Sequence, residues 1–157
     1  MSTAHTHEYW FGEAARVAES ALCARAQCGA LIVRDGVCLG SGYNAPPLDD
    51  PSQGRCMETG YDRSKKPKYD LTCCVHAEWR AIVAAVRSHG DLSGSTLYYV
   101  RLDAEGKRKP SREPFCTVCS RLALDVGIAS FALWHESGIV LYDTRDYNDR
   151  SYAYHFT

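Results

Sequence analysis

Apolar residues recur at helical spacing in three separate segments of the chain. The first covers residues 8–27, the second residues 76–86 and the third residues 116–125. Gly90 and Gly127 follow the second and third segments closely. A glycine soon after an apolar stripe is a common stop signal, so we expect three helices at these places.

Shorter runs of branched and aromatic residues predict five strands, at residues 30–33, 37–43, 96–102, 130–134 and 139–142. Asp35-Gly36 separates the first two and predicts a tight hairpin. The tail, residues 143–157, is expected to form a short helix that packs back. This order predicts an α/β fold with a mixed sheet and helices on its faces. A length of 157 residues suits a single domain spanning residues 1–157.

Residues 44–72 show neither the helical nor the strand pattern of apolar residues. They contain several prolines and glycines, Cys56 lies among them, and Cys73-Cys74 follows directly. A loop of this length inside a compact domain is usually functional, or is held by something other than a hydrophobic core.

Composition narrows the choice of partners. The net charge is −1 and the pI is about 6.6, so the chain has no overall attraction to nucleic acid or to an anionic membrane. No apolar run reaches membrane-spanning length, and the polar N-terminus is unlike a signal peptide, which predicts a cytoplasmic protein. Basic clusters at residues 63–68 and 107–109 are expected in solvated loops. Eight cysteines in a compartment that disfavours disulfides indicate metal binding or catalysis.

One histidine, one glutamate and two cysteines form the strongest chemical signal. His76 and Glu78 stand two residues apart at the start of one predicted helix, and Cys116 and Cys119 stand at the start of the next. Catalytic zinc takes three protein ligands and leaves a fourth position for water, and His76, Cys116 and Cys119 supply such a set. Two helix N-termini directed at the ion would favour thiolates and a negatively charged nucleophile.

Glu78 is too close to His76 in sequence to coordinate the same ion comfortably. Zinc brings the pKa of its bound water to about 7, which makes zinc hydroxide the expected nucleophile. Glu78 is then the expected proton shuttle, first as general base and then as general acid. A structural zinc beside an incidental glutamate is the alternative, although such a site normally shows a fourth Cys or His ligand. The pattern H-x-E…P-C-x-x-C is the signature of zinc-dependent nucleobase deaminases.

The chain resembles the cytidine deaminase superfamily, and within it the deoxycytidylate deaminases. The resemblance covers nearly the whole chain, and its motifs are GALIV at residues 29–33, GSGYNAPP at 40–47, HAE at 76–78, STLYYV at 95–100 and the C-x-x-C at 116–119. It implies a three-layer α/β/α fold around a five-stranded sheet, one catalytic Zn²⁺, and hydrolytic loss of the exocyclic amine from a cytosine-type ring.

The resemblance also implies two substrate contacts. Asn44 would hydrogen-bond the sugar or the base, and the backbone N–H of Ala77 would bind the ring carbonyl. A plainer interpretation makes Asn44 a turn residue that tolerates left-handed geometry.

Three departures from the family pattern bear on the substrate. Phe115 stands between Pro114 and the first cysteine, where the family usually has Pro alone, and either stacks on the substrate ring or marks a bulge. Ala45 replaces a usual glycine. Residues 103–113 resemble an insertion of about ten residues, a span typical of a hairpin or lid. Its basic side chains are candidates for a phosphate contact: Lys107, Arg108, Lys109 and Arg112.

Some deoxycytidylate deaminases are similar in carrying a structural zinc in the loop before H-A-E. The thiols available for such a second Zn²⁺ are Cys56, Cys73 and Cys74, with Cys28 or Cys23 at the end of the first helix. A second ion would order a loop that has no core. The alternative is a group of buried thiols without metal. His135 is expected to be a surface loop residue and not a ligand.

We therefore expect a zinc-dependent deaminase that converts a dCMP-like or CMP-like nucleotide, or the nucleoside, into its uracil counterpart and ammonia. A nucleic-acid or tRNA deaminase is the second possibility, since the basic insertion and the aromatic tail suit strand binding. The net charge and the long loop before H-A-E favour the free nucleotide. A purine or another heterocyclic base stays open, and intact Glu78 disfavours a catalytically silent subunit. By resemblance we expect a homo-oligomer, a dimer or a hexamer, with shared active sites.

Overall fold

The structure, a computed structural model, describes residues 5–23, 26–54 and 73–154 of the 157-residue chain. In chain order its elements are α1 (His7–Ala18), β1 (Gln27–Arg34), β2 (Val37–Tyr43), the 3₁₀ turns η1 (Pro47–Asp49) and η2 (Pro51–Gln53), α2 (Ala77–His89), β3 (Thr96–Leu102), β4 (Arg108–Lys109), α3 (Thr117–Asp125), β5 (Ser130–His135), β6 (Gly138–Asp143) and α4 (Thr144–Ala153). The tight turn expected at Asp35-Gly36 joins β1 to β2, and both of its residues have positive φ.

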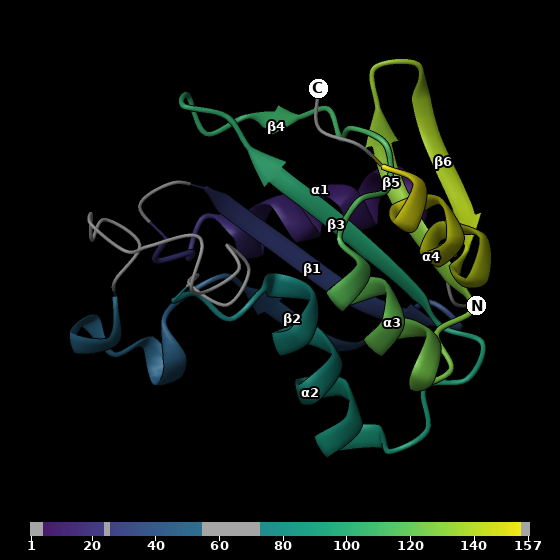
Figure 1. The fold of residues 1–157 in the computed structure, drawn as a ribbon, viewed down its shortest axis with the longest axis horizontal. Helices are drawn as coiled ribbons and strands as arrows, with labels where there is room; N and C mark the ends of the chain where they lie inside the picture. Colours follow the sequence, from purple (N-terminus) through teal and green to yellow (C-terminus); the bar gives the residue numbers. More distant parts are fainter. Residues whose placement is uncertain (1–4, 24–25, 55–72, 155–157) are drawn as a thin grey trace.

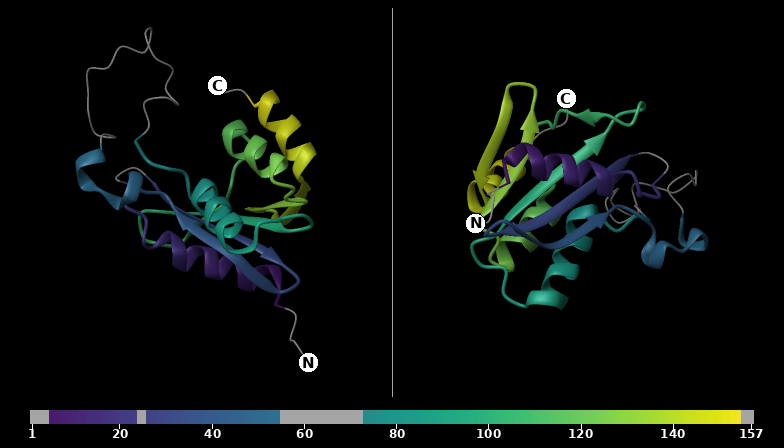
Figure 2. Two further views of the ribbon diagram at one scale, coloured as in Figure 1. Left: turned by 90° about the horizontal axis from the view of Figure 1, so that it is seen from below. Right: turned by 180° about the vertical axis from the view of Figure 1, so that it is seen from behind.

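Every strand in the described part of the chain belongs to one mixed sheet. Its order is β2-β1-β3-β5-β6, and the short β4 pairs with the end of β3. β3 and β5 run parallel, and the other pairs run antiparallel. Helices α2, α3 and α4 cover one face and α1 covers the other, as Figure 1 and the edge view in Figure 2 show. The predicted three-layer α/β/α fold is confirmed, and β4 adds a sixth strand to the five expected.

Alternating side chains along β1 and β3 divide the core in two. Leu31, Tyr98 and Val100 pack with Phe11 and Ala14 beneath α1. The opposite face meets the other three helices, and its buried residues include Ala30, Ile32, Leu97, Ala81, Ile82, Phe131 and Tyr147. Because side chains alternate across a strand, neighbouring residues of β3 serve different layers.

The first helix is shorter than its apolar stripe predicts. We expected residues 8–27 to be helical, but α1 ends at Ala18. The backbone N–H of Leu22 then donates to the carbonyl of Asn44, 3.0 Å away, and β1 begins at Gln27. The chain must reverse here to lay β1 beneath α1. That long-range pairing overrides the local helical preference of residues 19–23.

The described start of the long loop is fastened to α2. Arg80 of α2 donates to the Asp49 carboxylate at 2.8 Å and to the Pro46 carbonyl at 2.9 Å. Ala45 and Val75 form an isolated antiparallel bridge, so the two ends of the loop lie side by side. Within the described segments, no helix has the length and apolar character needed to cross a bilayer.

Candidate active site

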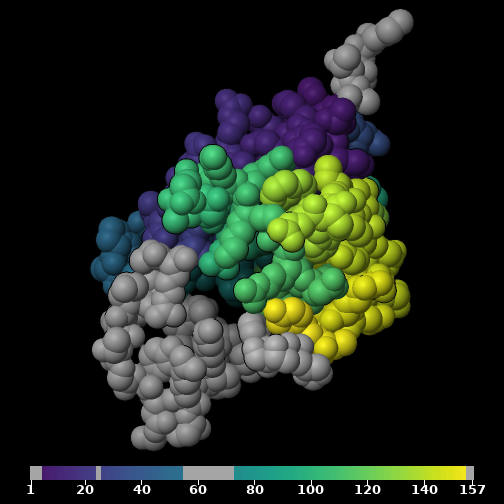
Figure 3. Space-filling view, turned by 90° about the horizontal axis from the view of Figure 1, so that it is seen from above, coloured from purple at the N-terminus to yellow at the C-terminus, as the bar shows by residue number. Residues whose placement is uncertain are grey.

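Two helices place their first turns at the same end of the sheet. His76 is the N-cap of α2, and Cys116 is the N-cap of α3. Glu78 and Cys119 lie in the first turns that follow. Both helices begin at their upper ends in Figure 1, and the surface seen from that end is hollowed beside the green residues that lead into α3 (Figure 3).

Gly42 of β2 allows α2 to approach the sheet this closely. A Cβ atom built on Gly42 would lie 2.5 Å from the carbonyl oxygen of Ala77 and 2.5 Å from the backbone nitrogen of Ala81. Real side chains are not accommodated at such distances, so only glycine suits this position. The start of α2, with His76 and Glu78, is therefore held directly against the sheet.

The structure brings together His76, Glu78, Cys116 and Cys119. One ligand atom from each lies within 4.8 Å of the others. His76 Nδ1 is 3.1 Å from Cys119 Sγ and 3.6 Å from Cys116 Sγ, and the two sulfurs are 2.7 Å apart. One nitrogen and two sulfurs converging in this way fit a zinc site with three protein ligands. Cys119 is fully buried and Glu78 is 6% exposed, whereas His76 and Cys116 are half-buried, so one side of the cluster is open to solvent.

The electrostatics of the cluster favour a thiolate. The hydrogen bond with Cys119 holds the pKa of Cys116 at about 5, against burial, and the His76 ring adds to this lowering. Burial lowers the pKa of His76, but the hydrogen bond with Cys116 and the nearby negative charges raise it by more. A metal ion would find a ready anionic sulfur here, because the thiolate is the form of cysteine that binds metal.

Two other members of the cluster resist losing their protons. Burial raises the pKa of the Glu78 carboxyl, and the charge of Cys116 raises it further. Burial and the hydrogen bond to Cys116 raise the pKa of Cys119 well above its usual range. A divalent cation between these groups would reverse both effects, since its charge favours the anionic forms.

Trp79 is a neighbour of the site that sequence reasoning missed. Its indole ring stacks on the His76 imidazole, with centroids 4.1 Å apart and an interplanar angle of 4°. The signal was present in the sequence, because residues three apart on a helix face each other. Nothing in the sequence shows that the N-cap histidine turns its ring toward that neighbour.

Asn44 directly follows β2, and both the oxygen and the nitrogen of its side-chain amide make hydrogen bonds within the chain. Its Oδ1 accepts a hydrogen bond from the backbone N–H of Cys28 at 2.8 Å, and its Nδ2 donates to the carbonyl of Ala26 at 2.9 Å. The side chain is thus a buried brace between β2 and the start of β1. One N–H of the amide is left for the substrate contact that the resemblance implies, because a primary amide carries two.

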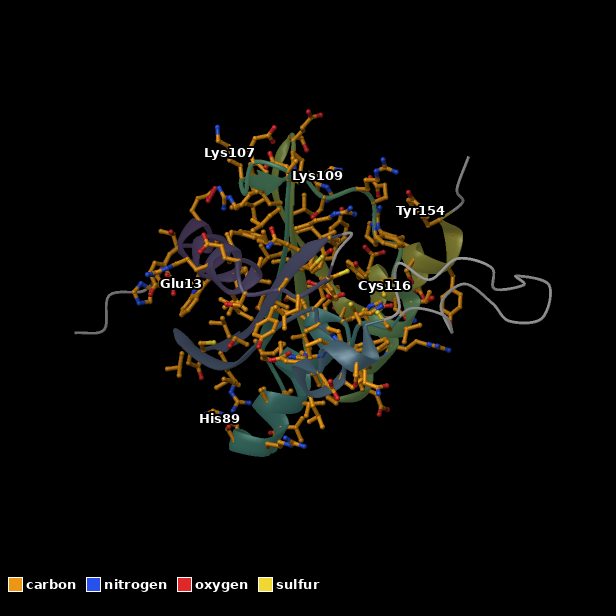
Figure 4. All side chains as sticks on the ribbon, turned by 90° about the vertical axis from the view of Figure 1, so that its left-hand side faces the viewer. Glu13, His89, Lys107, Lys109, Cys116 and Tyr154 are labelled. Atoms are coloured by element: carbon orange, nitrogen blue, oxygen red, sulfur yellow. The ribbon has the colours of Figure 1, made fainter. Side chains whose placement is uncertain are left out.

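Ala77 and Phe115 flank the cluster. Ala77 is the first residue of α2, so its backbone N–H has no intrahelical partner and faces the helix N-terminus. Phe115 is 50% exposed, and its ring centroid is 5.5 Å from that of Tyr154. Figure 4 shows Cys116 at the start of α3 and Tyr154 at the end of α4. The expected substrate contacts of both residues stay predictions.

The thiols considered for a second metal fall into two places. Cys28 Sγ lies 3.2 Å from the Tyr99 hydroxyl, and burial raises the pKa of Cys28 to about 11. Cys73 Sγ and Cys74 Sγ are 3.8 Å apart. Burial raises the pKa of Cys74, and hydrogen bonds with Cys23 and then Cys73 raise it further. Cys23 therefore contacts the Cys73-Cys74 pair, whereas Cys28 contacts Tyr99. Cys56 lies outside the described residues.

The predicted insertion forms a hairpin. The hairpin turns between β3 and β4, and Figure 4 shows Lys107 and Lys109 on it. Arg108 faces α1, where its guanidinium makes two hydrogen bonds with the Glu8 carboxylate and covers the Trp134 ring at 4.7 Å. Arg108 therefore serves the fold on the side of the sheet opposite the cluster, and the phosphate contact suggested for it is wrong.

His135 secures the far end of the same hairpin. It is the last residue of β5, and its two ring nitrogens lie 2.8 Å from the Ser111 carbonyl oxygen and 2.8 Å from the Tyr142 hydroxyl. We expected a surface loop residue, but His135 is half-buried and ties the hairpin to β6.

Comparison with known proteins decides the family. The profile of the cytidine and deoxycytidylate deaminase zinc-binding region matches residues 4–134. The chain belongs to this family. A deoxycytidylate deaminase of Mycobacterium phage D29 is 32% identical over 133 residues, which cover 82% of this chain and 93% of the phage protein. The protein is accordingly a deaminase, a hydrolase that acts on a C–N bond, and the recognition made from the motifs is confirmed.

Solved structures share the fold of this deaminase. The dCMP deaminase from cyanophage S-TIM5 in complex with dCMP and dUMP has a TM-score of 0.54 at 20% identity, with 83% of this chain and 82% of that one covered. A cytidine deaminase from Burkholderia pseudomallei has a TM-score of 0.61 at 18% identity, covering 91% and 96%. At these identities the likeness concerns the fold.

Proposed function

We propose that this deaminase acts hydrolytically on a cytosine-type nucleotide, dCMP-like or CMP-like, and releases ammonia. The observation that carries the proposal is the convergence of His76, Glu78, Cys116 and Cys119, whose ligand atoms lie within 4.8 Å of one another. His76, Cys116 and Cys119 would hold one Zn²⁺. When bound, the ion supplies an electrophilic centre that makes water nucleophilic near neutral pH.

Glu78 is the residue we propose for proton transfer. Its carboxylate would take a proton from the attacking water and deliver it to the amine, which then leaves as ammonia. Its position suits this role, because the buried carboxyl lies among the residues that would hold the ion. The Ala77 N–H would hold the ring carbonyl, and Asn44 would offer its remaining N–H to the sugar or the base.

The preference for a free nucleotide rests on the phage relative and on Arg101. The relative is named a deoxycytidylate deaminase. Arg101 pairs in register with Cys28 and stands two residues beyond Tyr99 on β3. Tyr99 packs on the face of the sheet that carries the cluster. Arg101 therefore projects from that same face, about 7 Å along the strand from Tyr99. It makes no hydrogen bond or ion pair with any described residue. A free guanidinium beside the site suits a phosphate, and we propose Arg101 in place of Arg108.

A substrate panel tests this proposal. Ammonia release should be fastest with dCMP or CMP and slow with deoxycytidine, cytosine, adenosine and guanine. Arg101→Gln should raise KM for the nucleotide and leave the slow nucleoside reaction unchanged, with Lys107→Gln on the hairpin as the matched control. Activity on single-stranded oligonucleotides without activity on any free compound would contradict the proposal.

We also propose a second Zn²⁺, held by Cys73, Cys74 and Cys23, with Cys56 as a candidate from the segment outside the described residues. The contacts of Cys74 with Cys73 and with Cys23 support it. A ratio of two zinc ions per chain, falling to one in Cys74→Ser with activity per catalytic zinc retained, is the expected result. A ratio of one in the wild type would contradict it.

We further propose that the chain is a single-domain, cytoplasmic homo-oligomer. Light scattering coupled to size exclusion should give a dimer or a hexamer, and a monomer with full activity would contradict shared active sites.

A further inference from the structure

We infer that Trp79 is a positioning residue for the metal ligand His76, and that it fixes the imidazole by stacking. The inference rests on the proposed role of His76 as a zinc ligand. It concerns how the ligand is oriented, which the proposed function leaves open.

The stacked pair is nearly parallel and close. The ring centroids are 4.1 Å apart and the planes differ by 4°. In this orientation His76 Nδ1 points at both sulfurs, 3.1 Å from Cys119 Sγ and 3.6 Å from Cys116 Sγ. A rotation of the imidazole about its Cβ–Cγ bond would turn Nδ1 away from the sulfurs and would also break the stack. The indole therefore opposes the motion that would misplace the ligand atom.

The His76 ring has no second hydrogen bond to a described residue that would fix its orientation. A metal-binding histidine almost always donates its second ring N–H to a carboxylate, a carbonyl or water, which fixes the ring orientation. Within the described residues, the hydrogen-bond partners of the His76 ring are the two cysteine sulfurs, and both are contacted by Nδ1. Nε2 has no hydrogen-bond partner there. Among the described residues, the contact that restrains the plane of the ring is therefore the stacked face of Trp79.

The buried indole N–H of Trp79 destabilises the fold, and packing alone does not explain why a tryptophan stands here. Trp79 Nε1 is buried and has no hydrogen-bond partner among the residues that the structure describes. Burying an N–H without a partner is destabilising, and leucine or phenylalanine would fill apolar space without that penalty. An aromatic face toward a ligand that becomes more positive on metal binding is a favourable electrostatic contact. Both points favour a role toward the metal.

Zinc affinity is the measurement that separates positioning from packing. Competition with a chelator, at a temperature where circular dichroism shows each variant folded, should give Trp79→Leu a zinc dissociation constant about 10- to 100-fold above wild type. Trp79→Phe keeps an aromatic face and should lie much closer to wild type. Trp134→Leu removes an indole from the opposite face of the sheet and should leave the affinity unchanged.

A second readout uses the indole itself. The chain has three tryptophans, so a Trp10→Phe, Trp134→Phe protein retains only Trp79. Its fluorescence should change on titration with zinc and saturate with the catalytic ion, and the change should disappear when His76→Ala is added. Unchanged fluorescence, or a wild-type zinc affinity in Trp79→Leu, would overturn the inference. Failure of the wild type to bind zinc through His76 would instead overturn the proposed function.

Discussion

The two faces of the sheet are covered by helices in similar ways, but only one of them carries chemistry. Beneath α1, Phe11 and its neighbours pack on Leu31, Tyr98 and Val100 in a hydrophobic core. On the other face the same apolar packing extends beneath α2 and α3, and then gives way to His76, Glu78 and the two cysteines. The difference lies in how the helices meet the sheet.

Helix α1 lies along the sheet and presents its side, whereas α2 and α3 present their first turns to a common point. A helix side offers only side chains, but a helix N-terminus adds unpaired N–H groups and a positive dipole end. Two such ends favour thiolates and developing negative charge. The α1 face therefore supports stability, and the α2 and α3 face supports stability and reactivity together. Variants on the two faces should separate these properties.

The largest expected effect is on turnover. Glu78→Gln should lower kcat by about 10²- to 10⁴-fold, because the proton shuttle is lost. Zinc should stay bound, and stability in urea should not fall, since a buried carboxyl is replaced by a neutral group of the same shape. Ammonia release and metal content measure both results. Glu13→Gln on α1 is the matched control, and wild-type turnover in Glu78→Gln would refute the assigned role.

A large-to-small change on the other face should affect only stability. Phe11 is fully buried and meets the Tyr98 ring edge-to-face at 5.3 Å. Phe11→Ala should reduce the free energy of unfolding by about 3–5 kcal/mol, through lost burial and the cavity left behind. Turnover per folded molecule should be unchanged below the transition temperature. A fall in kcat per active site would show that the two faces are coupled.

Substituting alanine for Gly29 or for Gly42 should have an effect of intermediate size, and the two variants form a matched pair on the two faces of the sheet. A Cβ on Gly29 would overlap the carbonyl of Ala14 in α1, and a Cβ on Gly42 would press on Ala77 and Ala81 in α2. Each change to alanine should cost about 1–3 kcal/mol of stability by overpacking. Only Gly42→Ala should also lower kcat of the folded protein and its zinc content, because it displaces the first turn of α2. Equal losses of kcat in both variants would contradict the distinction.

The smallest effect concerns the ion pair between Glu8 and Arg108. The hydrogen bond from Arg108 lowers the pKa of the Glu8 carboxyl below 4.5. A lowered pKa in the folded state means that the stabilisation is present above the unfolded value and is lost as pH falls through the folded one. Because Glu8 is half exposed, Arg108→Gln should cost only about 0.2–1 kcal/mol at neutral pH.

Stability curves of wild type and Arg108→Gln should therefore converge as the pH falls through the lowered pKa of Glu8, apart from a constant difference due to the contact of Arg108 with Trp134. Glu8→Gln preserves the contact of Arg108 with Trp134. The difference in unfolding free energy between Glu8→Gln and Arg108→Gln should therefore not change with pH in this range. A difference between wild type and Arg108→Gln that widens at low pH would contradict the assignment.

Much of the layout was predictable, because the signals were local. The turn at Asp35-Gly36, the starts of α2 and α3, and the spacing of His76, Glu78 and the C-x-x-C depend on residues within one or two turns of each other. The end of α1 was not predictable, since it depends on the hydrogen bond that the backbone N–H of Leu22 donates to the distant Asn44 carbonyl. The partners of Asn44 and the direction of Arg108 depend likewise on segments distant in sequence.

The sequence by itself determined the chemistry available: which residues carry nitrogen, sulfur and carboxylate, and at what spacing along two helix starts. That follows because helix geometry relates positions i and i+3 without reference to the rest of the chain. Only the tertiary structure decided which of these groups meet. Convergence of the two first turns depends on the sheet order and on the space left by Gly42, and the stack of Trp79 on His76 depends on a rotamer chosen by that packing.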